Sequence, residues 1–208
     1  MLRSMLLLLM LALPQPSAVP PSQAAPAEDA PGYTADGQLK FPAKYREWVF
    51  LSSGIDMSYN PKAAAASHSM FDNVFVNPSA YRSFQETGTW PDKATLVLET
   101  RGAESDISIN KRGHTQSAEV MGFEVHVKDA SLEGGWGFFV FDNQVSAKLA
   151  KRPAACYSCH EQHAAVDTTF VQFYPTLLGL AKTKGTLSAA YLKEITAPAP
   201  ASKPGASQ

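Results

Sequence analysis

Apolar and polar residues alternate along several stretches in the middle of the chain. The alternation is clearest from Met121 to Lys128, and a similar pattern runs from Phe71 to Val76. Thr95 to Glu99 is a short β-branched and apolar run, whereas Trp136 to Phe141 is apolar on both faces, which is typical of a central strand. These stretches predict four strands of a sheet.

Helical signals surround these strands. Asn77 followed by Pro78 is a typical helix start, and Gly88 is a typical helix end. Further helices are predicted from about Val145 to Lys151, through the region Cys156 to His160, and from Pro175 to Lys184. The order of helix, strands and helices favours an α+β domain in which an antiparallel sheet packs with helices.

The two ends of the chain differ in composition from the middle. Residues 1–24 combine Arg3, a short apolar run and small residues, which is the pattern of a secretory signal peptide. Residues 25–40 and 196–208 are rich in Pro and Ala, so they predict a flexible tether and a disordered tail. Residues 41–195 are then one domain. We expect a periplasmic or otherwise exported protein with no membrane anchor after signal removal.

The charge balance removes some classes of partner. The chain has 18 Lys and Arg residues against 19 Asp and Glu residues, for a formal net charge of -1. This balance gives no electrostatic case for binding nucleic acid or an anionic membrane surface.

The only two cysteines lie in one motif, Cys156-Tyr157-Ser158-Cys159-His160. In an exported chain, Cys-x-x-Cys-His predicts one covalent haem c, with Cys156 and Cys159 as thioether attachments and His160 as the axial iron ligand. A disulfide, a thioredoxin-like dithiol and a zinc half-site use the same residue types. The dithiol is disfavoured because no βαβ unit surrounds the motif, and zinc lacks a second cysteine pair. The motif therefore predicts a C-terminal haem c helix.

The methionines bear on the second axial ligand of the iron. Common electron-transfer cytochromes c carry a methionine ligand downstream of the haem motif, and no methionine follows His160 here. Met57, Met70 and Met121 are candidates, but a methionine in an apolar strand or loop is more often a core residue. An open sixth coordination position is therefore predicted. The helical-bundle cytochromes c′ share that feature but do not have the predicted strands.

Three stretches of the chain resemble one family. Residues 42–49, 75–92 and 156–175, the last containing the haem motif, are similar to the cytochrome P-460 and cytochrome c′-β group of small periplasmic haem proteins. The resemblance covers about residues 41–184. It implies a β-rich fold, a C-terminal haem motif and a homodimer.

One lysine separates the two branches of this family. In cytochromes P-460 a lysine on the strand after the Thr-Gly…Asp turn is bonded to the porphyrin, and those proteins oxidise hydroxylamine. The matching position here is Leu98, and the nearest lysine, Lys93, lies in the turn. The resemblance is therefore closer to the uncrosslinked c′-β type, which binds nitric oxide and similar diatomics at a five-coordinate haem.

The resemblance also implies aromatic residues over the open face of the haem. Phe71 and Phe75, on one side of one predicted strand, are the candidates for this distal cap, although two such residues are equally explained as core. An apolar cap favours uncharged ligands such as nitric oxide.

Polar residues separate a binding function from an enzymatic one. His68, Glu124 or His126 would support proton transfer if one of them enters the haem cavity, but an exposed sheet face explains the last two equally well. His163 is expected at the surface, and Asp167 either orients a group near the haem or caps a helix. Two functions stay open: binding of nitric oxide or a related ligand, and oxidation or reduction of hydroxylamine, nitric oxide or peroxide with a periplasmic electron carrier. Electron transfer alone is less expected.

Overall fold

The computed structural model describes residues 28–59 and 68–197, and in them one five-stranded sheet dominates. The strand order is β2-β3-β4-β5-β6, and every neighbouring pair is antiparallel. The strands are β2 (Val49–Ile55), β3 (Met70–Val76), β4 (Thr95–Glu104), β5 (Thr115–Lys128) and β6 (Trp136–Phe141). A second, two-stranded sheet pairs β1 (Leu39–Lys40) with β7 (Ser146–Ala147). The predicted α+β class with an antiparallel sheet is confirmed.

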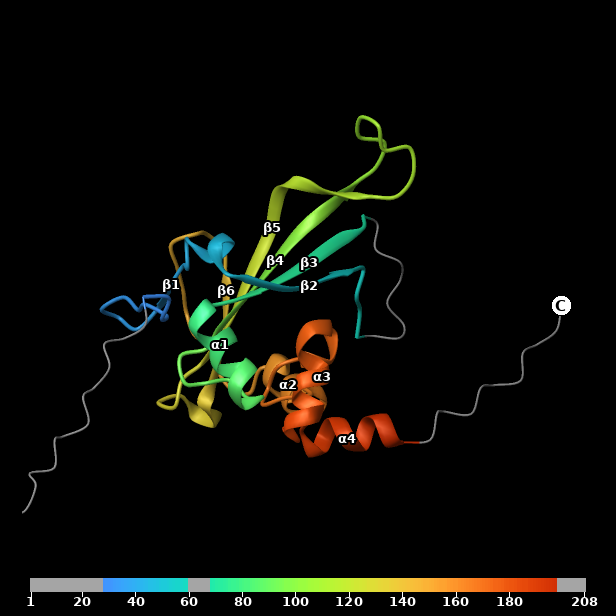
Figure 1. The fold of residues 1–208 in the computed structure, drawn as a ribbon. Helices are drawn as coiled ribbons and strands as arrows, with labels where there is room; N and C mark the ends of the chain where they lie inside the picture. Colours follow the sequence, from blue (N-terminus) through green and yellow to red (C-terminus); the bar gives the residue numbers. More distant parts are fainter. Residues whose placement is uncertain (1–27, 60–67, 198–208) are drawn as a thin grey trace, which may run out of the picture.

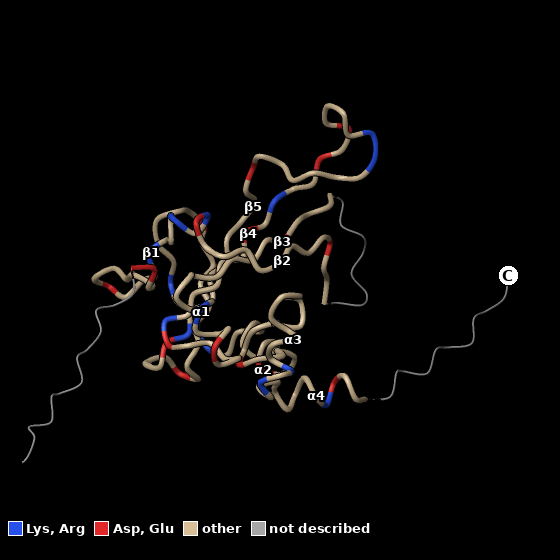
Figure 2. The backbone as a smooth tube through the Cα atoms, viewed as in Figure 1, with Lys and Arg blue, Asp and Glu red and all other residues tan. Residues whose placement is uncertain are grey.

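The helices gather at one end of this sheet, and the β4–β5 hairpin extends away from them (Figure 1). They are α1 (Pro78–Thr87), α2 (Ala155–His163), α3 (Pro175–Lys184) and α4 (Ala189–Thr196), with short 3-10 turns η1 (Tyr45–Glu47), η2 (Glu133–Gly135) and η3 (Val171–Phe173). None of the helices within the described ranges is long and apolar enough to cross a membrane. Acidic and basic residues are interspersed around the fold (Figure 2), as the near-zero net charge suggests.

Helix α1 begins and ends where the sequence predicts. Pro78 is its first residue, and Gly88 ends it in the left-handed conformation with φ 78°. A Cβ on Gly88 would also lie 2.7 Å from the Lys184 side chain, so a glycine is required here for two reasons. The Asn77 side chain does not cap the helix; its Oδ1 accepts a hydrogen bond from the Thr95 backbone N–H (2.8 Å). Asn77 thereby ties α1 to β4.

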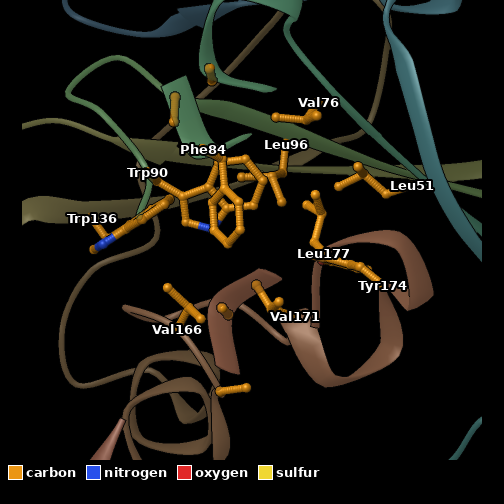
Figure 3. Packing of buried hydrophobic residues seen from close by; sticks show 14 residues of the cluster. Leu51, Val76, Phe84, Trp90, Leu96, Trp136, Val166, Val171, Tyr174 and Leu177 are labelled. Carbon is orange, nitrogen blue, oxygen red and sulfur yellow. The ribbon is translucent and has the colours of Figure 1, made fainter. Parts of the chain in front are cut away.

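The sheet carries a hydrophobic core on each face. One core fills the space between the sheet and the helices, where the Phe84 and Trp90 rings lie 4.3 Å apart at its centre (Figure 3). The other covers the opposite face and includes Leu39, Tyr45, Phe75, Val97, Phe123, Val125, Val127, Phe139, Phe141 and Ala147. Because both faces of the sheet are buried, apolar side chains occur on both sides of a strand.

Two predictions about the segment after β5 are wrong. Strand β6 lies at the edge of the sheet rather than in its centre. Its outer side is covered by the following chain, since Phe139 bridges Leu149 and the Ala150 N–H donates to the Phe138 carbonyl (2.8 Å). That chain is the predicted helix at 145–151, which instead contains β7 because Ser146 and Ala147 pair with β1. A pairing across about a hundred residues leaves no local signal.

The described part of the predicted tether packs on the domain. Asp29 accepts hydrogen bonds from the Ser79 backbone N–H and hydroxyl, both at 2.7 Å, at the first turn of α1. Leu39 is 1% exposed and belongs to β1. Residues 28–40 therefore contact the fold that was predicted to begin at residue 41. The predicted signal peptide, residues 1–24, and the predicted tail beyond residue 197 lie outside the described residues.

Candidate functional site

A cavity of about 310 Å³ lies between the sheet and the segment that carries α2 and η3. The sheet side of this cavity is lined by residues that include Asp72, Val74, Leu96, Leu98, Glu124, His126, Phe138 and Val140. The other side is lined by Cys156, His160, Thr169, Phe170, Phe173 and Tyr174. A wider hollow beside the N-terminal segment contains no cysteine or histidine, so the chemistry of the motif belongs to the first cavity.

Helix α2 presents the motif to this cavity. Tyr157 points inward, is 4% exposed, and donates its hydroxyl to the Ala150 carbonyl at 2.9 Å. Cys156 and Cys159, on either side of it, are partly exposed free thiols. The buried tyrosine therefore anchors the helix, which leaves both thiols partly exposed and places Cys156 on the cavity wall.

The His160 ring has one defined nitrogen role. Its Nδ1 lies 2.7 Å from the Thr168 carbonyl oxygen, and a carbonyl can only accept, so Nδ1 carries the proton. Burial lowers the pKa of His160, against the opposing effect of this hydrogen bond. The ring is therefore neutral near pH 7, and its Nε2 has no hydrogen-bond partner among the described residues, so the lone pair can bind a metal.

These donors fit a covalently attached haem. Two free thiols three residues apart and a neutral imidazole with a free nitrogen are the donor set of haem c, and Cys156 and His160 line one cavity. The same thiols are not joined as a disulfide. Across residues 28–59 and 68–197, no group of three or more His, Cys, Asp or Glu side chains is arranged to hold a metal ion.

Aromatic rings surround His160. The ring centroids of Phe170, Phe138 and His126 lie 4.2, 4.7 and 5.0 Å from that of His160. His126 is 8% exposed and stacks on Phe138 at 3.9 Å. Burial, with a smaller contribution from His160, lowers the pKa of His126 well below its usual value, so this ring is neutral too. Of the polar candidates from the sequence, His126 is the one whose ring packs against that of His160.

Two carboxylates also face the cavity. Glu124 on β5 pairs directly with Leu98 on β4, and Asp72 on β3 pairs with Thr100, two residues further along β4. Asp72 accepts a hydrogen bond from the Thr100 hydroxyl (2.9 Å), whereas Glu124 has no hydrogen-bond partner within the described part of the chain. Burial, and then the charge of Asp72, raise the pKa of Glu124. The cavity therefore contains a carboxyl group that is able to take up a proton.

The two phenylalanines predicted to cap the haem lie on the other face of β3. Phe75 belongs to the core on the far side of the sheet, where its ring is 5.4 Å from that of Tyr45. Phe71 has the same parity, and neither residue lines the cavity. The cavity is faced by Asp72 and Val74 instead. Sequence alternation identifies the two faces of a strand, but only the tertiary fold shows which face meets the cavity.

The remaining sequence candidates are dispersed. Asp167 accepts hydrogen bonds from Lys128 (3.0 Å) and from the Trp90 backbone N–H (3.3 Å), so it fixes a loop and does not cap a helix. His163 is exposed and pairs with Glu194 (2.8 Å). His68, also exposed, does not line the cavity.

The structure shows where Leu98 and Lys93, the two positions relevant to a lysine crosslink, lie. Leu98, which the sequence resemblance predicts to match the crosslinking lysine, lines the cavity. Lys93 lies in the turn, where its amine pairs with Asp129 at 2.6 Å. No lysine lines the cavity in residues 28–59 and 68–197.

The connection after β2 contributes two more cavity residues, of which Tyr59 was not a candidate from the sequence. Met57 and Tyr59 line the cavity, and the Met57 thioether packs against Gly54. Tyr59 stacks on Phe173 with centroids 6.3 Å apart. Met57 was one of three methionines considered as iron ligands; Met70 and Met121 do not line the cavity.

Comparison with known proteins agrees with this geometry. The family model described as Cytochrome P460 matches residues 42–171, which include the five strands β2 to β6 and the whole Cys-x-x-Cys-His motif. A search of curated proteins found no match.

Proposed function

Because the chain belongs to the cytochrome P460 family, a family of haem-binding cytochromes, we propose that it carries one covalent haem c with an open sixth coordination position. In this proposal Cys156 and Cys159 attach the porphyrin and His160 is the axial ligand. The open position binds nitric oxide or a related small nitrogen species. The observation that carries the proposal is the hydrogen bond from His160 Nδ1 to the Thr168 carbonyl, which leaves Nε2 free at the cavity.

The bound group would supply an iron that binds small ligands and changes oxidation state. The chain contributes the rest. The thiols on α2 would hold the porphyrin, the Thr168 carbonyl holds the His160 proton, and the rings of Phe138 and Phe170 shield the His160 ring from water. On the sheet side, Val74, Leu98 and Val140 give a largely apolar wall, which favours an uncharged ligand.

Two side-chain arrangements support an open sixth position. His126 packs beside His160, with the two rings edge to face, and its own ring is held by neighbouring aromatic residues. Met57 is engaged with Gly54 at the cavity wall.

The same wall supports the uncrosslinked branch of the family. An amine at position 98 would be needed on the cavity face of β4, and that position holds Leu98. Lys93 is paired with Asp129 in the turn. We therefore propose a haem held only by two thioether bonds.

A second function is favoured by one observation, the carboxyl group of Glu124 on the cavity wall beside Asp72. An oxidoreductase acting on hydroxylamine, nitric oxide or peroxide needs a group that moves protons, and a carboxyl with a raised pKa suits that task. If hydroxylamine is oxidised, Glu124→Gln is expected to slow turnover by about 10²-fold or more. Wild-type protein that shows no turnover with an artificial electron acceptor would exclude this function.

Location and partners remain part of the proposal. The signal pattern in residues 1–24 supports an exported, periplasmic protein, and the family resemblance supports a homodimer. An oxidoreductase would also require a periplasmic electron carrier.

The proposal is tested by denaturing mass spectrometry on protein matured with haem in a bacterial periplasm, together with the spin state of its ferrous iron. We expect one haem on the peptide that contains Cys156 and Cys159, no porphyrin on any lysine peptide, and a high-spin five-coordinate iron. Absence of covalent haem would refute the attachment, and a low-spin spectrum would refute the open position.

A further inference from the structure

We propose that His126 is a positioning residue for the axial histidine, fixing the His160 ring both by direct contact and through Thr168. This inference rests on the proposed ligation of haem iron by His160. Strand β5 thereby takes part in positioning the iron ligand, although the motif itself lies on α2.

The first contact is direct. The His126 ring meets the His160 ring edge to face, with centroids 5.0 Å apart and planes at 79°. His126 is itself held between Phe138, at 3.9 Å and 18°, and Trp136, at 4.5 Å. Because these neighbours immobilise His126, its edge limits rotation of the His160 ring about its own side-chain bonds.

The second contact passes through Thr168. The Thr168 carbonyl accepts the His160 Nδ1 proton at 2.7 Å, and the Thr168 hydroxyl lies 3.4 Å from His126 Nε2. One residue therefore contacts both histidines. A shift of His126 displaces the acceptor that sets the orientation and basicity of the axial ring.

The loop that carries Thr168 is also bound to Lys128, which lies two residues after His126 on β5. Lys128 Nζ donates to Asp167 (3.0 Å) and to the Trp90 carbonyl (2.7 Å). The Trp90 indole N–H donates to the Thr169 hydroxyl at 2.7 Å. Residues 167–169 are thus bound to β5 and to the turn before β4, so the sheet determines where the acceptor carbonyl stands.

The choice of histidine at this position also has a physical reason. A phenylalanine would keep the stacking on Phe138 and the edge contact with His160, but it has no nitrogen to meet the Thr168 hydroxyl. The two contributions of His126 are therefore separable by mutation. The axial histidine's orientation and hydrogen bonding tune the iron–histidine bond and the reduction potential of the haem.

The experiment measures the iron–histidine stretching band by resonance Raman spectroscopy on the ferrous holoprotein, together with its midpoint potential and its rate of nitric oxide dissociation. Four single variants are compared: His126→Ala, His126→Phe, Thr168→Val and His163→Ala. His163 is the matched control because it lies on the same helix as His160 but is exposed and paired with Glu194. Haem content by mass spectrometry and stability in urea are measured on every sample.

We expect His126→Ala to shift and broaden the band, move the potential, and change nitric oxide dissociation by on the order of tenfold. His126→Phe restores most of the wild-type band, Thr168→Val gives a smaller shift, and His163→Ala matches wild type. A purely structural role would lower stability in urea without moving the band or the potential.

The inference fails if fully haem-loaded His126→Ala keeps the wild-type band and potential. If that variant does not mature with haem, the double variant His126→Phe/Thr168→Val, which preserves the ring packing, decides: a changed band supports the inference and an unchanged band overturns it. Failure of the proposed function is distinguishable, because wild-type protein would then lack covalent haem or the iron–histidine band.

Discussion

Glu99 and Glu124 sit on neighbouring strands of one sheet and face opposite sides of it. The Glu99 side chain is 0% exposed and accepts hydrogen bonds from Tyr45, Arg46 (2.8 Å) and Arg101 (2.6 Å). Glu124 faces the cavity and has no hydrogen-bond partner in the parts of the chain that are described. The difference separates a carboxylate that supports the fold from one that is available for chemistry.

The physical reason lies in the cost of burying charge. An ionised carboxyl away from water is tolerated only with partners, and Glu99 has two guanidinium groups and a phenol. Burial alone would raise the pKa of Glu99, but the hydrogen bonds from Arg101 and Tyr45 outweigh it and lower the pKa. Nothing comparable acts on Glu124, so burial and Asp72 raise its pKa. The two groups therefore give stability opposite dependences on pH.

Removal of the two motif thiols is expected to have the largest effect at the cavity. Cys156→Ala/Cys159→Ala leaves no nucleophile for thioether formation, so we expect complete loss of covalent haem by denaturing mass spectrometry. Ser158→Ala, an exposed position between the two cysteines, should keep the haem. Covalent haem on the double variant would contradict the assigned attachment.

On the opposite face of the sheet, the informative variant is Glu99→Gln. Removing this charge leaves Arg101, whose side chain is only 13% exposed, without its ionic partner, so the free energy of unfolding in urea should fall by about 3 kcal/mol near pH 7. Because the pKa of Glu99 is lowered in the fold, its contribution disappears as pH falls below the unfolded value of about 4.3 through the folded one. The gap between wild type and variant should therefore close in acid.

Glu119→Gln, an exposed position on the β4–β5 hairpin, is the control and should change stability by less than about 0.5 kcal/mol. Equal stability of Glu99→Gln and wild type near neutral pH would show that the network does not support the fold.

The stability of Glu124→Gln relative to wild type is expected to depend on pH in the opposite sense to that of Glu99→Gln. With a raised folded pKa, wild type should lose stability relative to this variant as pH rises from about 4.3 through the folded pKa. Near neutral pH the variant should thus be at least as stable as wild type. Urea unfolding across this range measures both trends, and a variant that is less stable at neutral pH than in acid, relative to wild type, would contradict the assignment.

The smallest expected effect is that of Met57→Leu. If the Met57 thioether is only part of the cavity wall, a leucine of similar volume keeps the wall and leaves the spin state of the iron unchanged. Absorption and electron paramagnetic resonance spectra of the two proteins should coincide. Conversion of a low-spin wild-type spectrum to a high-spin one in the variant would identify Met57 as an iron ligand.

Local patterns predicted much of this molecule. Helix α1 between Pro78 and Gly88, the helix that carries Cys156, and the strand alternation around Glu124 depend on neighbours within a few residues, so the sequence contains them. The edge position of β6 and the pairing of β7 with β1 depend on contacts distant in sequence, and both were missed.

The candidate site follows the same division. The Cys-x-x-Cys-His motif predicts Cys156, Cys159 and His160 as site residues from the sequence alone, because its spacing is local. The choice of Phe71 and Phe75 for the cavity was wrong because alternation gives two faces without saying which one the helices cover. Asp72 shares that strand and was missed for the same reason.

The most direct test of the account is the absorption spectrum of the ferrous, haem-loaded protein before and after addition of nitric oxide. We expect a high-spin c-type spectrum that shifts when the gas binds at the open position opposite His160. A low-spin spectrum that does not respond to nitric oxide would mean that the sixth position is filled, and it would contradict the account.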